Sequence, residues 1–233
     1  MPSPSQQFDT PIPKWHAEDV SRLPGDTEFD RIFPEPIREV SEYHWSSVEV
    51  CRHAAKWLVT GSETRVLDVG SGPGKFCAIG AVSTRGHFTG VEQRLHLCRI
   101  AWGMLDHYKI PRVKILHANV TEVEFNCFDA FYLFNPFQEN LEPALKIDNL
   151  VPVRLELYDR YINYVRRELT NVRLGTRVVT FWGDCDEIPP SYECVETAFG
   201  GELRLWIKRR VGACVRTARE KFSLPSATKF TIV

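Results

Sequence analysis

The sequence predicts an α/β protein with a doubly wound, mostly parallel sheet of seven strands that ends in an antiparallel hairpin. Three observations lead to this prediction. Strand-like runs alternate with helix-like segments from residue 66 to residue 181, which implies parallel strands covered by helices on both faces. A glycine-rich turn joins the first strand to the next helix. The last two strand-like runs are separated only by residues 199–202, too few for a crossover helix, so they should pair antiparallel.

The elements follow in order along the chain. Strands are expected at residues 66–69, 88–91, 113–116, 130–134, 177–181, 192–198 and 203–208. Helices are expected at 74–83, 93–108 and 153–174, and an amphipathic helix within 44–59 should precede the first strand. Gly61 and Gly175 lie where glycines that end helices are common. Right-handed crossovers then make the sheet doubly wound.

The chain divides into three parts. Its 233 residues allow one full α/β domain with additional segments. Prolines and aromatic residues cluster in residues 1–43, which predicts a proline-rich N-terminal arm packed on the domain. Structural covering is the favoured role of this arm, and a lid over the active site is the alternative. Residues 44–210 form the expected catalytic domain, and residues 211–233 form a basic tail, interpreted as solvated rather than as a nucleic-acid contact.

Composition narrows the possible partners. A formal net charge of -1 provides no general attraction to nucleic acid, which makes nucleic acid an unlikely partner. No apolar stretch reaches the length of a membrane span, and the N-terminus lacks the features of a secretory signal, so we expect a cytoplasmic protein without a membrane partner. The seven cysteines form no C-x-x-C pair, and no metal site is predicted.

The glycine-rich turn is the most informative motif. Gly70, Gly72 and Gly74 follow the first strand, and such residues permit unusual φ angles and a close approach of a ligand to the backbone. The spacing is G-x-G-x-G, and Lys75 occupies the place of the third glycine in the dinucleotide-binding pattern G-x-G-x-x-G. Asp68 is unusual inside an apolar strand, and its carboxylate needs partners: either loop amides or a cationic ligand reached through water.

Polar residues also end the later strands. Glu92 ends the second strand, where a carboxylate can accept hydrogen bonds from both hydroxyls of a ribose. Asn119 follows the third strand and could bind an adenine edge or serve as a turn residue. Asn135, Pro136 and Phe137 follow the fourth strand, at the sheet edge where ligands bind. Pro136 should hold Asn135 in an extended conformation, and an ordinary Asn-Pro turn is the alternative interpretation.

Together these motifs resemble the class I S-adenosylmethionine-dependent methyltransferases, over roughly residues 45–210. V-L-D-V-G-S-G-P-G is similar to the first motif of that family, N-P-F to its fourth motif, and the terminal hairpin to its reversed seventh strand in a Rossmann-like methyltransferase fold. Asn119 stands where the family often has Asp. The resemblance implies S-adenosyl-L-methionine as cofactor and Asn135, Pro136 and Phe137 as the catalytic turn. It implies a cofactor site made of Asp68, Gly70, Ser71, Gly72, Gly74, Glu92, Gln93, Asn119, Val120 and Asn135.

The function implied by this resemblance is methyl transfer to a small molecule or to a protein amine or hydroxyl. Positioning and electrostatics would carry most of the catalysis, although a hydroxyl acceptor would need a general base. Glu139 and Asp184 are candidates for this base, with ordinary surface acids as the favoured interpretation. Two other functions remain: a nucleotide-dependent oxidoreductase, against which Lys75 and the hairpin argue, and a catalytically inactive methyltransferase-like binding protein, against which the glycine loop and Glu92 argue.

Overall fold

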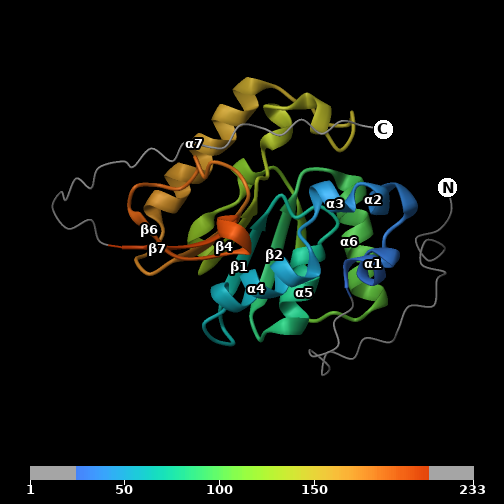
Figure 1. The fold of residues 1–233 in the computed structure, drawn as a ribbon, viewed down its shortest axis with the longest axis horizontal. Coiled ribbons are helices and arrows are strands. Elements are labelled where there is room, and N and C mark those ends of the chain that lie inside the picture. The colour runs from blue at the N-terminus through green and yellow to red at the C-terminus, as the bar shows by residue number, and fades with distance from the viewer. Residues whose placement is uncertain (1–24, 210–233) are drawn as a thin grey trace.

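Seven strands form one sheet in the order β3-β2-β1-β4-β5-β7-β6 in a computed structural model that describes residues 25–209 (Figure 1). Strands β1 to β5 are parallel, and β7 runs antiparallel to both of its neighbours, β5 and β6. This confirms the predicted fold class. The strands are β1 (Arg65–Val69), β2 (His87–Glu92), β3 (Val113–His117), β4 (Ala130–Phe134), β5 (Arg177–Phe181), β6 (Tyr192–Ala198) and β7 (Leu203–Lys208).

The main helices also match the predictions, apart from how two of them end. They are α4 (Val48–Leu58), α5 (Lys75–Ser83), α6 (Leu95–His107) and α7 (Leu155–Asn171). Helix α4 ends with Val59 in an extended conformation, and Gly61 has no positive φ, so Gly61 is not the helix-ending glycine that we expected. Gly175 does have a φ of 80°, but it lies beyond the end of α7, in the turn that leads to β5. Both expectations about the helix ends were therefore wrong in detail.

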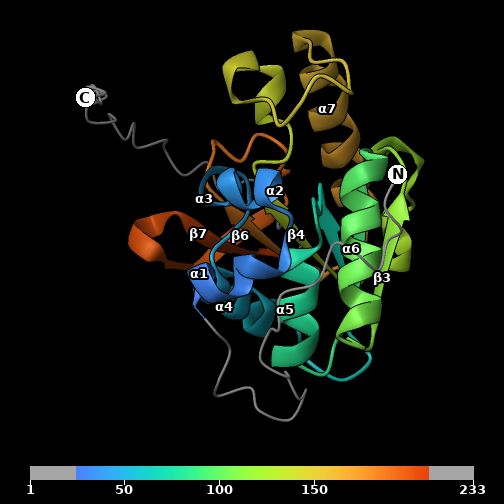
Figure 2. The same ribbon diagram turned by 90° about the vertical axis from the view of Figure 1, so that its right-hand side faces the viewer.

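Helices cover both faces of the sheet (Figures 1 and 2). Helices α4, α5 and α6 share one hydrophobic core with one face, and α7 shares a second core with the other face. Helix α5 is buried nearly all round, and a Cβ at Gly80 would lie 2.4 Å from the Phe88 ring. The small side chain at position 80 therefore lets α5 approach β2 closely.

The second face carries fewer helices than the first. Two short 3-10 helices, η4 (Val120–Glu122) and η5 (Phe125–Cys127), connect β3 to β4 in place of a full α-helix. Residues 182–191 connect β5 to β6 without any helix. The segment between β4 and α7, residues 135–154, lies at the carboxyl end of the sheet and contributes to the site described below.

The described part of the N-terminal arm packs on the domain. It consists of α1 (Asp26–Phe29), the 3-10 turn Asp30–Ile32, α2 (Glu35–Glu39) and α3 (Ser41–His44). Phe29, Ile32 and Phe33 join the same core as α4 and α5. The predictions about residues 1–24 and about the basic tail at 211–233 fall outside the described residues. Among residues 25–209, no helix has both the length and the apolar character needed to cross a membrane.

Candidate active site

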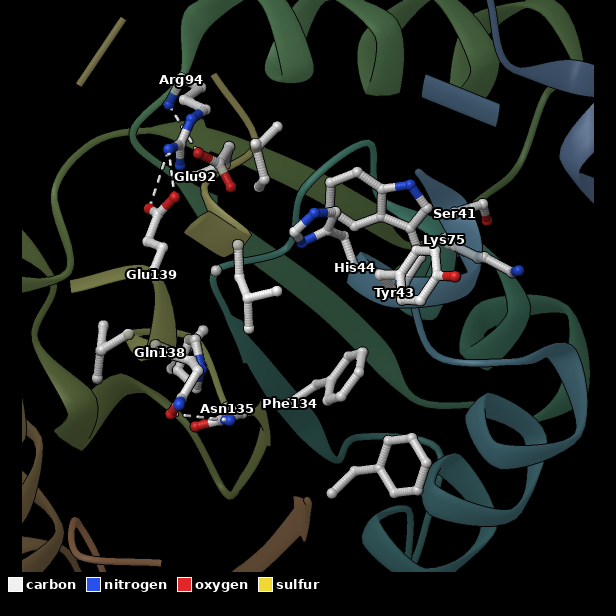
Figure 3. A pocket seen from close by; sticks show the side chains of 18 of the residues that line it. Ser41, Tyr43, His44, Lys75, Glu92, Arg94, Phe134, Asn135, Gln138 and Glu139 are labelled. Carbon is white, nitrogen blue, oxygen red and sulfur yellow. Dashed lines mark hydrogen bonds and ion pairs between the residues drawn. The ribbon is translucent and has the colours of Figure 1, made fainter. Parts of the chain in front are cut away.

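A cavity of about 870 Å³ opens at the carboxyl ends of β1, β2, β4 and β5. Three segments supply most of its wall: the strand ends with the glycine loop, the segment that follows β4, and residues 26–47, which comprise the described part of the arm and the start of the domain (Figure 3). Eight of the predicted site residues line it, and they come from four separate loops: Gly70, Glu92, Gln93, Asn119, Val120, Asn135, Pro136 and Phe137. Asp68, Ser71, Gly72 and Gly74 do not line it.

The glycine loop needs its glycines for conformation and for space. Gly70, Gly72 and Gly74 have φ angles of 76°, 54° and 83°, a region that other residues adopt at a cost. A Cβ at Gly70 would lie 2.9 Å from the Cβ of Pro136, and a Cβ at Gly72 would lie 2.4 Å from the Trp45 ring. The loop is thus closed on one side by the turn after β4 and covered at Gly72 by the ring of Trp45, which follows the arm.

Glu92 lies at the centre of the loop contacts. Its side chain is buried, with 5% of the residue exposed, and it lines the cavity. The backbone N–H of Gly72 donates to its Oε2 at 3.1 Å, and the N–H of Arg94 donates to its Oε1 at 2.7 Å. Burial raises its pKa, although these hydrogen bonds lower it in part. Because a carboxylate can accept about four hydrogen bonds, Glu92 keeps capacity to bind two further hydroxyl groups.

Among the described residues, Asp68 accepts no hydrogen bond from an amide of the glycine loop, and it does not line the cavity. It alternates along β1 with Leu67 and Val69, which face α7, so its side chain points to the opposite face of the sheet, under α5. There it is fully enclosed, and the Cys77 thiol donates to it at 3.4 Å. Burial raises its pKa to about 7. Its position away from the cavity therefore makes Asp68 part of the helix–sheet packing.

Asn119 is a turn residue that also lines the cavity. Its Oδ1 accepts hydrogen bonds from the backbone and the hydroxyl of Thr121, at 3.1 and 2.8 Å, and so caps η4. Its Nδ2 donates to the hydroxyl of Tyr161 at 3.0 Å. The polar atoms of its side chain are therefore already engaged. Val120 is the first residue of η4, and its backbone N–H has no partner within the helix, so this amide is available to a ligand.

The turn after β4 has a different backbone from the one we predicted. Asn135 has a φ of 41°, in the left-handed region, so the expectation of an extended conformation before Pro136 was wrong. The backbone N–H of Gln138 donates to the carbonyl of Asn135 at 3.2 Å, which closes a tight turn. Asn tolerates this region better than most residues, and such strained positions cluster at functional sites. The Asn135 side chain packs against Gly183, where a Cβ would lie 3.0 Å from its Oδ1.

A chain of hydrogen bonds sets the orientation of the Asn135 amide. Gln138 Nε2 donates to Glu142 Oε1 at 2.7 Å, and Asn135 Nδ2 donates to Gln138 Oε1 at 3.2 Å. A carboxylate can only accept, so Glu142 fixes which end of the Gln138 amide faces it, and Gln138 in turn fixes the Asn135 amide. Among residues 25–209, no donor is bonded to Asn135 Oδ1. This oxygen is therefore the acceptor left free at the end of the series of hydrogen bonds from Glu142 through Gln138 to Asn135.

Sequence reasoning missed Arg94, which organises the segment after β4. Its guanidinium is buried and contacts both oxygens of Glu139, at 2.9 and 2.7 Å, and Oδ2 of Asp148 at 3.2 Å (Figure 3). These ion pairs connect the end of β2 to Glu139 and Asp148, which lie 45 and 54 positions later in the sequence. Glu139, a candidate general base from the sequence, is thus held in an ion pair. Asp184, the other candidate, is exposed and lines a neighbouring cavity.

His44 was also missed, and it stands on the opposite wall of the cavity from Arg94 and Glu139 (Figure 3). It ends α3, beside Tyr43. Burial lowers the pKa of His44, while Glu139 raises it and Arg94 lowers it. The imidazole is therefore neutral at pH 7 and can accept a proton. No sequence pattern distinguished this histidine, because its place in the cavity depends on how the arm folds over the domain.

Lys75 joins the arm to the glycine loop. It begins α5, is only 3% exposed, and pairs with Asp26 at 2.7 Å and Asp30 at 2.8 Å. Its ammonium group also lies 5.5 Å from the centre of the Phe29 ring. These ion pairs hold the start of the described part of the arm against the first turn of α5. Within the described chain, no cluster of three or more His, Cys, Asp or Glu side chains is arranged to hold a metal ion.

Comparison with known proteins adds information at the level of fold. No family model matches the chain, and no curated protein matches it. Solved structures do match. The chain resembles TrmN from Thermus thermophilus at 13% identity and a TM-score of 0.52, with 72% of this chain covered. It resembles a variant of MtNAS in complex with S-adenosylmethionine at 13% identity and a TM-score of 0.51, with 83% covered.

The chain has the class I methyltransferase fold. This methyltransferase fold occupies only part of several similar structures. The match spans 50% of the TrmN chain and 70% of the MtNAS chain. It spans 43% of the cyclase SpnF, which is 18% identical with a TM-score of 0.45. The chain therefore spans about half the length of the first of these structures, and at such identities the likeness establishes the fold alone.

Proposed function

We propose that the protein is an S-adenosylmethionine-dependent methyltransferase whose acceptor is a small molecule or a protein side chain that presents an N–H or O–H group. The observation that carries this proposal is the buried carboxylate of Glu92 at the cavity wall, bonded to the glycine loop and with accepting capacity left. It supports a ribose-bearing cofactor. One of the similar structures, the MtNAS variant, is a complex with S-adenosylmethionine.

The residues of the cavity fit this cofactor. Glu92 would hold the ribose hydroxyls, the backbone N–H of Val120 would bind the adenine, and the exposed backbone of Gly70 would lie along the amino-acid part. The rings of Phe137 and Tyr161, with centres 5.3 Å apart, would form an apolar wall for the base. The cavity volume of about 870 Å³ leaves room for an acceptor beside the cofactor. When bound, the cofactor would supply an activated methyl group on a sulfonium.

The chain's own residues would position the acceptor. Asn135 Oδ1 is left free by the hydrogen bonds that connect Asn135 to Gln138 and Gln138 to Glu142. It would accept a hydrogen bond from the N–H or O–H group of the methyl acceptor and so direct the lone pair of that N or O atom. Phe134 and Phe181, whose ring centres are 5.0 Å apart, line the cavity beside Asn135 and exclude water from it. His44, neutral at pH 7, would take the proton of a hydroxyl or of a charged amine.

The experiment is a methyl-transfer assay with labelled S-adenosylmethionine across amine, hydroxyl and protein acceptors. In this assay Asn135→Ala should lower kcat/KM by about 10- to 100-fold, the effect of losing one positioning hydrogen bond. Asn126→Ala is the matched control, because Asn126 is exposed in η5 and does not line the cavity. Equal rates for the wild type and Asn135→Ala would remove Asn135 from the mechanism. No transfer to any acceptor, with cofactor binding intact, would favour a catalytically inactive binding protein.

A further inference from the structure

A second cavity, of about 510 Å³, adjoins the first behind the turn after β4. The two cavities share a wall, because five residues line both: Asn135, Pro136, Phe137, Gln138 and Trp182. The charged side chains of the second cavity are all acids, namely Glu142, Asp184 and Glu187. No Lys, Arg or His lines it among the residues that the structure describes.

Glu187 is the residue that makes this cavity more than a solvated acidic surface. It is buried, with 8% of the residue exposed, and still lines the cavity. Within residues 25–209 its carboxylate forms no ion pair and accepts no hydrogen bond from another residue; only its own backbone amide supports it. Burial raises its pKa, and Arg166 lowers it only in part. The Arg166 guanidinium instead donates to the carbonyl of Asp186.

A buried carboxylate without a cation is costly, so its persistence at a cavity wall points to a ligand of opposite charge. The arginines that contact this loop bond to other groups. Arg204 donates to the carbonyl of Gly183 at 3.2 Å and contacts the sulfur of Cys185 at 3.1 Å, and neither it nor Arg166 lines the cavity. The negative charge of the cavity is therefore offset only in part, by Arg166, and is not paired with a cation among the described residues.

Aromatic rings complete the cavity. Tyr158, Phe137 and Trp182 line it, and Trp182 is 55% exposed at a φ of 60°. The pKa of Tyr158 is raised to about 12 by burial and by the charges of Asp186, Glu187 and Asp184, which reports the negative potential at this place. Organic cations are bound by just this combination of carboxylates and aromatic faces.

We propose that the second cavity binds an ammonium or guanidinium group carried by the methyl acceptor, on Glu187 and beside Trp182. The shared wall then places the cation on one side of the Asn135 turn while the methylated atom reaches the first cavity on the other side. Binding of the cation rests on the second cavity alone, whereas the role of the cation in the acceptor rests on the proposed function.

The test is calorimetric titration of the full chain with butylguanidinium and with butylurea, its neutral isostere. We expect butylguanidinium to bind at least about tenfold more tightly than butylurea, because a hydrogen bond to a buried charge is worth about 1.5–3 kcal/mol. Glu187→Gln should weaken the binding of butylguanidinium by at least about tenfold. Asp184→Asn, at an exposed position, should weaken it by about two- to fivefold. The control Glu193→Gln, on β6 and 65% exposed, should bind as the wild type does.

Each outcome separates this proposal from the proposed function. Equal affinity for the two probes, or equal affinity of Glu187→Gln and wild type for butylguanidinium, would overturn the cation site. A parallel titration with S-adenosylmethionine identifies which proposal fails. If S-adenosylmethionine binds but butylguanidinium binds no more tightly than butylurea, only the proposed cation site is overturned. If butylguanidinium is preferred but S-adenosylmethionine does not bind, only the proposed function is overturned. Urea unfolding of Glu187→Gln should show no loss of stability, because the Gln side-chain oxygen can still accept the hydrogen bond from its own backbone amide and a buried charge is removed.

Discussion

Gly72→Ala is predicted to disrupt the contact between Trp45 and the glycine loop. An added Cβ would lie 2.4 Å from Cζ3 and 2.8 Å from Cε3 of Trp45. The indole cannot easily move away, because the residue is only 8% exposed and its Nε1 donates to the carbonyl of Ile37 at 3.3 Å. The substitution also places a side chain at a φ of 54°.

The expected cost has two parts. The left-handed backbone costs about 1–2 kcal/mol for a residue with a Cβ, and forcing the buried ring to shift costs about 1–3 kcal/mol more. Gly175→Ala isolates the first part, because Gly175 has a φ of 80° and nothing lies within 4 Å of its Cβ position. We therefore expect Gly72→Ala to lower the free energy of unfolding by about 1–3 kcal/mol more than Gly175→Ala does.

Urea unfolding of the full chain measures both variants, with the double variant Trp45→Leu/Gly72→Ala as a third arm. Once the indole is removed, the additional cost of Gly72→Ala should fall to that of Gly175→Ala. Equal costs for the two glycine variants in the wild-type background would refute the reasoning, because they would show that Trp45 does not press on the loop.

Two further predictions concern charge. Lys75→Met removes the cation from the carboxylates of Asp26 and Asp30 and should lower the free energy of unfolding by about 3 kcal/mol. Lys109→Met breaks only an exposed ion pair and should cause no measurable loss. Equal losses for the two variants in urea unfolding would contradict a stabilising role for the buried Lys75 ion pairs. Because burial lowers the pKa of His44, the unfolded chain binds more protons than the folded chain between that lowered value and about 6.5, so stability should fall as pH drops through this window. His44→Gln should flatten this part of the pH profile of the unfolding free energy, and an unchanged profile would count against a buried neutral imidazole.

The sheet could be predicted closely from the sequence because its signals are local. The bounds of β4 to β7 match the predicted ranges to the residue, since each run is apolar or alternating and ends at turn residues or at a short linker. The lining position of Glu92 followed from the same logic, because the carboxyl ends of parallel strands meet at one edge of the sheet.

The missed features all depend on partners that are distant in sequence. Asp68 was placed near the ligand because its true neighbour, Cys77, follows only from how α5 packs on β1. Asn135 adopts a left-handed conformation because the Gln138 turn and the packing on Gly183 override the bias imposed by the following proline. The ion pair of Arg94 spans 45 positions, and charge alone does not indicate such a pairing.

Binding of the cofactor tests the central claim most directly. Calorimetric titration of the full chain should show S-adenosylmethionine binding at one site per chain and no binding of NAD. Glu92→Gln should weaken the binding of S-adenosylmethionine by at least about tenfold, since it removes a charged acceptor. The control Glu63→Gln, at an exposed position, should leave the affinity unchanged. Binding of NAD without S-adenosylmethionine, or equal affinity of Glu92→Gln and wild type, would contradict this account.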